Sequence, residues 1–432
     1  MSQLQRPARP ASLFPKLKSG PKAMNAEEVA AHQQARLSGA MIAAVARRGY
    51  PATTVDELGA LAGVSKRDFY RLFSSKQECF FATFEQLTDD FAGQVERAAT
   101  AAVGLRDQAT ATIEALADVI ETAPGAVALV LVDSLTVGEA ADDPRRRSQE
   151  RFATLLQAAF AQMPEGEVSA LTARAIVVGI RRLAYRTIRD RTPQRLRRAA
   201  PALADWIVAY AQAPSGPDRI MTPAVLPQRP PASELDWEEP PAGPIARMEL
   251  SQRERIMRAI AQLVCKDGYG KLTIPAISAT AGTSNQTFYA EFGGKEEAFL
   301  AGFDALAEEA LEATRSGIDA GATWPARAEE ALASYLAHLQ SERLFAELAY
   351  LELPAMGRAG LERLDVFMDE LAGIFEADAP VPKPSDRDEL VSAAIVGGVW
   401  GAIRQEIMSG KRTELTALQP ALIRFVSVGF GS

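Results

Sequence analysis

Two stretches of the sequence decide the fold because they repeat one another. Residues 49–81 read GYPATTVDELGALAGVSKRDFYRLFSSKQECFF, and residues 268–300 read GYGKLTIPAISATAGTSNQTFYAEFGGKEEAFL. They align without a gap at an offset of 219 residues, with 13 identities in 33 positions. The same offset places 175–179 on 394–398 near the ends of the two copies. A constant offset over this distance predicts two tandem copies of a whole unit.

Composition predicts that both copies are helical. The chain has 432 residues, of which 47% are hydrophobic and only 7% are aromatic. Ala, Leu, Arg and Glu dominate the periodic stretches, and these residues favour helix over sheet. We therefore expect an all-α protein with more than one domain.

Cap signals in the first copy predict a pair of short helices. An amphipathic helix over about 36–48 ends at a Gly-Tyr pair. Thr54 followed by Glu57 forms a capping box, and the turn at residues 63–65 precedes a second helix that Ser65 caps. Two short helices joined by a glycine-bearing turn form a helix-turn-helix, whose second helix fits a DNA major groove.

The second copy has the same signals. A helix over 255–267 precedes Thr273, which is the predicted cap of the next helix, and Pro275 is tolerated in its first turn. The turn at residues 282–284 then ends at Ser284, the predicted cap of the second short helix. The sequence therefore predicts two helix-turn-helix units.

These blocks resemble the N-terminal DNA-binding domain of the TetR (tetracycline repressor) family of transcriptional regulators. The resemblance lies in the Ala-Gly-x-Ser turn, the Phe-Tyr-x-x-Phe helix and the following Lys-x-Glu. It implies recognition helices at 65–73 and 284–292, and a helical ligand-binding and dimerisation domain after each helix-turn-helix. Outside the two blocks, the match extends only to the length and layout of the helices.

The resemblance also implies which side chains meet DNA. Tyr70 and Tyr289 would reach phosphates, and Lys76 and Lys295 would bind phosphate at the start of the next helix. Basic side chains of the first recognition helix suit guanine, whereas Asn285 and its neighbours suit adenine or thymine. The candidate DNA-binding residues are Thr54, Ser65, Lys66, Arg67, Tyr70, Arg71, Lys76, Thr273, Ser284, Asn285, Gln286, Thr287, Tyr289 and Lys295.

Both copies depart from the family pattern. Leu72 and Glu291 stand where the family often has a phosphate-contacting His, and Asp68 stands where a small hydroxyl residue is common. Residues 36–81 carry seven basic and four acidic side chains, whereas residues 251–300 carry six and five. The second site is therefore the weaker candidate, and an alternative function is a ligand-binding or protein-interaction module in which only the first half binds DNA.

Domain boundaries follow from the repeat and from composition. Residues 213–247 contain nine of the 26 prolines, so this segment is expected to be a linker. The net charge of −8 hides a basic N-terminal end, where residues 1–26 carry five basic and no acidic side chains. The predicted domains are an arm, expected to be disordered, at 1–33, helix-turn-helix domains at 34–85 and 248–303, regulatory domains at 86–212 and 304–432, and the linker at 213–247.

The regulatory domains are expected to pair within one chain. In the family, the last two helices of each subunit form a four-helix dimer interface. The resemblance thus implies that 168–190 and 196–212 pack against 389–408 and 413–430. One chain would form a pseudo-dimer with two unlike recognition helices, suited to an asymmetric operator on double-stranded DNA. Further homodimerisation stays open.

The predicted function is ligand-responsive transcriptional regulation, more often repression than activation, under a small apolar or amphipathic effector. Four aromatic residues are candidate pocket residues: Tyr185, Phe345, Tyr350 and Trp400. Aromatic residues at helical spacing are more often plain core, so that alternative stays open.

Several classes of function are disfavoured. Two histidines and two cysteines, Cys79 and Cys265, make a metal cluster or disulfide scaffold improbable, and no phosphate loop or nucleophile elbow occurs. We expect no enzyme activity, no cofactor and no shared redox role for the thiols, which do not correspond under the offset. The longest apolar run is too short to cross a bilayer, and the N-terminus resembles no signal peptide, so a cytoplasmic protein without membrane contact is expected.

Overall fold

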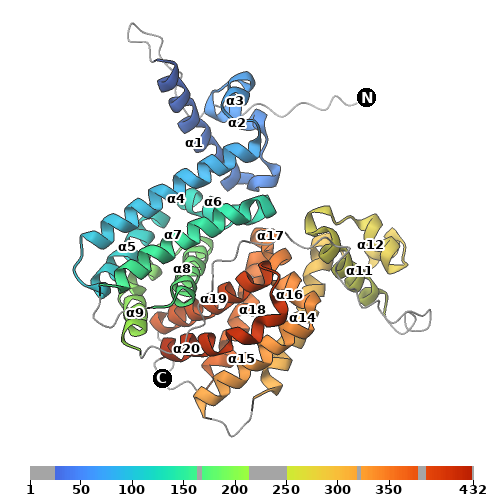
Figure 1. Ribbon diagram of the computed structural model, residues 1–432. Helices are drawn as coiled ribbons and strands as arrows, with labels where there is room; N and C mark the ends of the chain where they lie inside the picture. Colours follow the sequence, from blue (N-terminus) through green and yellow to red (C-terminus); the bar gives the residue numbers. More distant parts are fainter. Residues whose placement is uncertain (1–24, 163–167, 214–250, 319–322, 378–385, 431–432) are drawn as a thin grey trace, which may run out of the picture.

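The computed structural model describes residues 25–162, 168–213, 251–318, 323–377 and 386–430. Within these ranges the chain forms α-helices joined by short 3-10 or π segments, and it contains no strand. The all-α prediction is confirmed. Figure 1 shows the helix-turn-helix units as two projections from a common helical body.

The first copy runs from blue to green in Figure 1. Its elements are α1 (Ala26–Ala52), α2 (Val55–Ala62), α3 (Lys66–Leu72), α4 (Lys76–Thr100), α5 (Leu105–Thr122), α6 (Pro124–Leu131), η1 (Asp133–Val137), η2 (Glu139–Ala141), α7 (Asp142–Phe160), α8 (Ala170–Asp190) and α9 (Pro193–Gln212).

The second copy runs from yellow to red. Its elements are α11 (Gln252–Asp267), η4 (Tyr269–Lys271), α12 (Ile274–Ala281), α13 (Asn285–Glu291), α14 (Lys295–Ser316), α15 (Trp324–Ser341), α16 (Arg343–Glu347), η5 (Leu348–Glu352), α17 (Leu353–Ala355), α18 (Arg358–Glu376), α19 (Asp386–Met408), η6 (Arg412–Leu418) and α20 (Gln419–Gly429).

The first helix begins earlier than the sequence pattern suggested. Asn25 caps α1 through a capping box with Glu28, so the helix starts at Ala26 and not near residue 36. The part of the predicted arm after residue 25 is therefore helical, not disordered. The rest of the arm, at 1–24, and the linker at 214–247 lie outside the described residues. Helix α1 is interrupted at Gly49, whose φ of 76° lies in the region that favours glycine.

A pair of equivalent glycines shows that the repeat extends into the loops of the helical body. Gly138 has a φ of 88° and Gly357 has a φ of 77°, and these residues are 219 positions apart. Both precede the helical segments that lead into or form α7 and α18. The offset therefore relates the two bodies residue by residue at this point.

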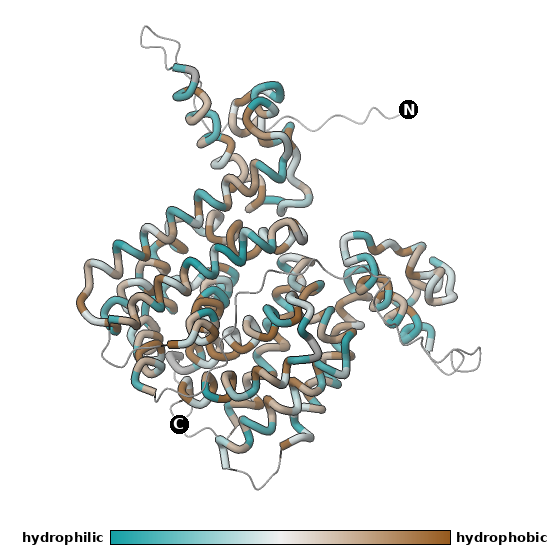
Figure 2. Tube along the Cα trace, in the orientation of Figure 1, coloured by the Kyte–Doolittle hydropathy of each residue, from teal (hydrophilic) through white to brown (hydrophobic). Residues whose placement is uncertain are grey.

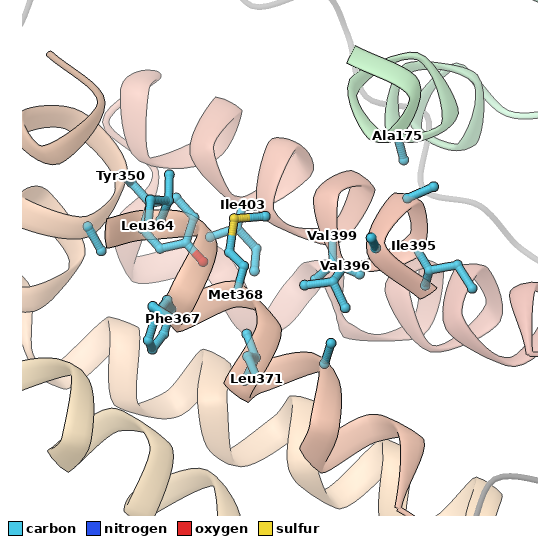
Figure 3. Close-up of a cluster of buried hydrophobic side chains, with 14 of the residues drawn as sticks. Ala175, Tyr350, Leu364, Phe367, Met368, Leu371, Ile395, Val396, Val399 and Ile403 are labelled. Carbon is cyan, nitrogen blue, oxygen red and sulfur yellow. The ribbon is translucent and has the colours of Figure 1, made fainter. Parts of the chain in front are cut away.

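The two copies meet where α8 crosses α19, and the contact is reciprocal. A Cβ added to Gly179 would overlap the carbonyl group of Ala394, and a Cβ added to Gly398 would lie 2.8 Å from the carbonyl oxygen of Ala175. Under the offset of 219, Gly398 is the counterpart of Gly179 and Ala394 is the counterpart of Ala175. Reciprocal contacts of this kind are the signature of a two-fold interface. In Figure 3, Ala175 lies on α8 facing α19.

Helices α9 and α20 extend this contact. The hydroxyl group of Tyr210 donates a hydrogen bond of 2.9 Å to the carbonyl oxygen of Phe425, and the two rings stack with centroids 5.1 Å apart. Trp206, the counterpart of Phe425, packs edge-on against it at 6.3 Å. Gly429 is the counterpart of Tyr210, and a Cβ there would lie 2.9 Å from the Tyr210 hydroxyl.

The buried apolar residues fall into two clusters. One joins the first helix-turn-helix unit to α6, and the other runs through both bodies and includes the second helix-turn-helix unit. Figure 2 shows apolar residues along the faces where helices meet.

Among the described residues, no helix is both long and apolar enough to span a membrane. Cys79 and Cys265 are buried free thiols, and burial raises the pKa of Cys79 to about 12.

Candidate nucleic-acid interface and effector region

The turn of the first helix-turn-helix unit forms as its cap residues predict. Thr54 accepts a hydrogen bond of 3.2 Å from the backbone N–H of Glu57 at the start of α2. The predicted capping box is only half formed, because the Glu57 carboxylate pairs with Arg47 and not with the backbone of Thr54. Gly63 ends α2 in the left-handed conformation with a φ of 62°. The hydroxyl of Ser65 then accepts a bond of 3.1 Å from the N–H of Asp68, which starts α3. These bonds fix the angle at which α3 leaves the turn.

The second unit repeats this geometry. Thr273 accepts a hydrogen bond of 3.4 Å from the N–H of Ala276, and Gly282 is left-handed with a φ of 65°. Ser284 accepts a bond of 3.0 Å from the N–H of Thr287, which starts α13. The cap residues predicted in both copies are therefore confirmed as caps.

Each recognition helix buries phenylalanine and exposes tyrosine. Phe69 and Phe288 are fully buried, as the resemblance implied, whereas Tyr70 and Tyr289 are 51% and 59% exposed. The side chains at the start of both helices, at Lys66, Arg67, Asn285 and Gln286, are exposed. The two tyrosines occupy equivalent positions, so both units carry an exposed ring on the outer face of the recognition helix.

Two basic side chains of the first recognition helix already have acidic partners. The ammonium group of Lys66 lies 3.0 Å from a carboxylate oxygen of Asp56, and this hydrogen bond raises the pKa of Lys66. Arg71 lies 3.2 Å from the carboxylate of Asp68 and donates a hydrogen bond of 3.1 Å to Gln33. These pairs are exposed, so a phosphate or a base edge can compete for the cation.

The two lysines after the recognition helices bond to the segments that precede α2 and α12. The Nζ atom of Lys76 donates hydrogen bonds of 2.9 Å to the carbonyl oxygens of Tyr50 and Thr53, and burial lowers its pKa. Lys295 donates a bond of 2.9 Å to the carbonyl oxygen of Leu272. An ammonium group has three donors, so each lysine retains at least one for phosphate. The predicted phosphate contact stays a prediction.

The second unit contains a basic residue that the sequence pattern missed. Arg253 donates a hydrogen bond of 2.9 Å to the carbonyl oxygen of Glu291, and its guanidinium lies 4.1 Å from the centre of the Phe292 ring. It places a positive charge at the C-terminal end of the second recognition helix. The sequence feature that could have pointed to Arg253 is its position in the first turn of α11.

A buried carboxylate joins the second unit to the body. Glu352 in η5 accepts a hydrogen bond of 2.9 Å from the backbone N–H of Tyr269 in η4. Its counterpart under the offset is Asp133, where burial raises the pKa to about 7 although Arg358 acts in the opposite direction. Neither residue belongs to a recognisable motif, so sequence reasoning did not find them.

The structure brings together two of the four candidate effector residues. The rings of Tyr350 and Trp400 stack with centroids 5.5 Å apart, and the hydroxyl groups of Tyr350 and Tyr335 are 2.9 Å apart. The cavity that they line leaves room for about one water molecule. Figure 3 shows Tyr350 amid the apolar side chains of α18 and α19.

The other two candidates lie elsewhere. Phe345 is fully buried and packs against Phe367 at 5.6 Å and Phe303 at 6.2 Å, so it lies in plain core. Tyr185 lies on α8 of the first copy, where the guanidinium of Arg189 is 5.9 Å from its ring centre. An effector role for these residues stays a prediction.

Two capped helix-turn-helix units on one helical body define a tandem helix-turn-helix protein. Comparison with known proteins assigns it more narrowly. Residues 40–83 and 256–301 both match the family described as bacterial regulatory proteins, tetR family. The chain therefore carries the N-terminal domain of this family twice.

One curated relative is the HTH-type transcriptional activator FasR of Mycolicibacterium smegmatis. It is 38% identical over 74 residues, which are 17% of this chain and 34% of the relative. The match therefore spans about a third of the length of that protein.

Solved structures resemble parts of the chain. The regulator FadR from Bacillus subtilis, in complex with stearoyl-CoA, is 15% identical with a TM-score of 0.35, and covers 40% of this chain and 96% of its own. A putative transcriptional regulator from Pseudomonas aeruginosa PAO1 is 20% identical with a TM-score of 0.37, and covers 41% and 91%.

Proposed function

We propose that this protein is a DNA-binding transcriptional regulator, not a catalyst, and that one chain supplies both of the recognition helices that bind an operator. The observation that carries the proposal is the matched pair of capped units, each with an exposed tyrosine on its recognition helix. The two matches to the N-terminal domain of the tetR family support the same function.

The fused pseudo-dimer is supported by the reciprocal contacts of α8 and α19. Gly179 meets Ala394 and Gly398 meets Ala175, as in the two-fold interface of a homodimer. The hydrogen bond from Tyr210 to Phe425 adds a polar contact between the copies. Such a chain needs no second subunit to present two recognition helices, although further self-association remains compatible with it.

We propose an operator with unlike half-sites about one helical turn apart, ~34 Å. Helix α3 exposes Lys66 and Arg67, whereas α13 exposes Asn285 and Gln286. Arginine and lysine pair best with guanine, and asparagine and glutamine pair best with adenine. We propose repression, relieved when a small apolar or amphipathic effector binds the body and favours a different spacing of the two units.

The test is selection of bound fragments from random DNA, followed by mobility-shift assays of two double variants. The proposal expects an asymmetric site, and expects Lys66→Ala with Arg67→Ala and Asn285→Ala with Gln286→Ala each to weaken binding to it. Arg198→Ala, at an exposed position of α9, is the control that leaves binding unchanged. A perfect palindrome, bound only by a dimer of chains, contradicts the proposal.

A second candidate is a module in which only the first unit binds DNA. Two observations favour it, the half-buried Glu291 on α13 and the lower positive charge of residues 251–300. The same assay separates the candidates. Loss of specific binding only in the Lys66→Ala and Arg67→Ala variant supports the degenerate second unit.

A further inference from the structure

A pocket lies where α7 and α8 of the first copy meet α19 of the second. It is lined by four arginines and two carboxylates, which are Arg145, Arg146, Arg174, Arg404, Asp142 and Glu150. Trp400 and Met408 form an apolar part of the wall. The cavity has a volume of about 70 Å³ and opens to solvent.

Several donors in this wall have no hydrogen-bond acceptor within the described part of the chain. They are the buried atoms Nε of Arg145, Nε of Arg146, Nη2 of Arg174 and Nε1 of Trp400. Arg145 is only 8% exposed. A buried donor without an acceptor costs about 1–3 kcal/mol, and more when the group is charged. The pocket therefore presents donors that an added acceptor would stabilise.

The carboxylates nearby do not neutralise the arginines fully. Arg145 lies 3.3 Å from Asp142, and Arg146 lies 2.9 Å from Asp143 and 3.1 Å from Glu150. Arg404 donates its Nε hydrogen to the carbonyl oxygen of Tyr350, at 2.9 Å.

The pKa values of the arginines reflect their burial and the remaining positive charge. Burial lowers the pKa of Arg145, and the positive charge of Arg404 lowers it further. Burial also lowers the pKa of Arg174, although Glu150 and Glu406 act in the opposite direction. Guanidinium groups stay protonated in proteins, so the cations remain in place and lack part of their counter-charge.

The pseudo-equivalent contact on the other side of the molecule, where α18 and α19 of the second copy meet α8 of the first, shows which groups occupy such a seam between the copies. There, Arg182 of α8 lies 3.0 Å from Asp365 and 2.9 Å from Asp369 of α18. Arg189 lies 2.5 Å from Asp365, and Arg186 lies 2.7 Å from Asp369. Arginines of one copy are thus neutralised by aspartates of the other.

The offset of 219 residues shows how the pocket departs from that seam. Gly401, Gln405 and Met408 stand in place of Arg182, Arg186 and Arg189, and Arg146 stands in place of Asp365, whereas Glu150 keeps the acidic character of Asp369. Three arginines are missing from α19, and Gly401 carries no side chain, so space is left. A positive charge on α7 replaces Asp365, so one of the two counter-charges is left out as well.

We propose that this pocket binds an oxyanion, the carboxylate or phosphate group of a small amphipathic molecule, in the role that Asp365 plays at the opposite seam. The donors of Arg145, Arg174 and Arg404 hold the oxyanion, and Trp400 and Met408 pack against its apolar portion. Arginine suits this role because its planar fork matches both oxyanions. The proposed binding does not depend on the proposed function, and only a role of this binding in regulation rests on it.

The test is thermal unfolding of the full chain with hexanoate, hexyl phosphate, inorganic phosphate or hexanol, at constant ionic strength set with sodium chloride. A ligand that binds only the folded state raises Tm with concentration. We expect hexanoate or hexyl phosphate to raise Tm by several degrees, and hexanol to leave it unchanged. Inorganic phosphate as effective as hexyl phosphate would identify a free anion as the ligand. Equal shifts with hexanol, or no shift with any oxyanion, overturn the proposal.

Variants separate a ligand site from a structural cluster. Removing one partner of a buried ion pair is strongly destabilising, and the cost is smaller where the cation lacks part of its counter-charge. We expect Arg145→Met and Arg404→Met to lower Tm without ligand less than Arg182→Met does, and to abolish the oxyanion shift. Arg182→Met, at the neutralised seam, should lower Tm because Asp365 and Asp369 lose their partner.

Arg151→Met is the matched control, since Arg151 lies on α7 but is 39% exposed and pairs with Asp89. It should retain the full oxyanion shift. If Arg145→Met lowers Tm as Arg182→Met does and leaves the shift intact, the pocket arginines are structural and the proposal is wrong. A normal oxyanion shift with failed DNA binding contradicts only the proposed function, and the reverse contradicts only this inference.

Discussion

Glu352 accepts a hydrogen bond from the backbone N–H of Tyr269 and so ties the second helix-turn-helix unit to the helical body. The carboxylate is buried, with 5% exposure. It lies in η5, next to Leu351 and two residues from Tyr350, whose ring stacks on Trp400. Any movement of η5 therefore acts directly on the turn that precedes α12.

Loss of this bond should loosen the second unit. In Glu352→Ala the N–H of Tyr269 loses its acceptor, so we expect a loss of about 1–3 kcal/mol in the free energy of unfolding. Hydrogen exchange of the Tyr269 amide should accelerate more than that of amides in α19. Glu370→Ala, at an exposed position of α18, is the control. Unchanged exchange at Tyr269 would show that the bond does not anchor the unit.

Asp133 should make stability depend on pH in an unusual direction. Burial raises its pKa in the folded protein to about 7, above the ordinary value of 3.8. The folded state therefore holds the proton while the unfolded state releases it, and stability falls as pH rises from about 4 to 7. This interval corresponds to at most about 4 kcal/mol.

In Asp133→Asn that contribution is absent. Urea unfolding at pH 5 and pH 8 should show the variant gaining stability over the parent protein as pH rises. Asp90→Asn, at an exposed position of α4, should follow the parent at both values. A constant difference between the Asp133 variant and the parent across this range would contradict the raised pKa.

The α8–α19 crossing should tolerate no side chain at Gly179. A Cβ there would overlap the backbone of Ala394, so Gly179→Ala should destabilise the chain by about 1–3 kcal/mol. Gly373→Ala, in α18, places its Cβ in open space and should stabilise by up to about 1 kcal/mol. Guanidinium chloride unfolding measures both. Equal effects of the two substitutions would mean that the helices separate without cost.

The exposed tyrosines should contribute to DNA affinity without setting sequence preference. Removal of one hydroxyl in Tyr70→Phe or Tyr289→Phe should weaken operator binding by about 0.5–1.5 kcal/mol, roughly 2-fold to 10-fold. Fluorescence anisotropy with the selected operator and with a scrambled duplex measures this loss, which should be similar for both. A loss confined to the operator would assign these tyrosines to base contacts.

The sequence was informative wherever a signal is local. Thr54, Ser65, Thr273 and Ser284 cap the expected helices because an N-cap needs only a side-chain oxygen and the three residues that follow it. The offset of 219 residues similarly gave the order of helices in both copies.

The resemblance predicted that the last two helices of each copy pack together, and the structure has these contacts, but the sequence did not show which side chains meet there. The role of Glu352, the clash at Gly179 and the unmatched arginines around Trp400 arise from how helices cross, and no local pattern reports a crossing. The early start of α1 was also missed, because the capping box at Asn25 and Glu28 stands before a stretch of weak apolar period.

Gly429 makes the two halves of the chain unable to exchange places. Tyr210 fills the room that this glycine leaves, and its hydroxyl reaches Phe425 through that room. A chain made of two first halves would have a tyrosine in place of Gly429, in the space that Tyr210 fills. A chain made of two second halves would have a glycine in place of Tyr210 and would lack the hydrogen bond to residue 425. After duplication, the two contact surfaces have thus diverged from identical to complementary, and each half now fits only the other.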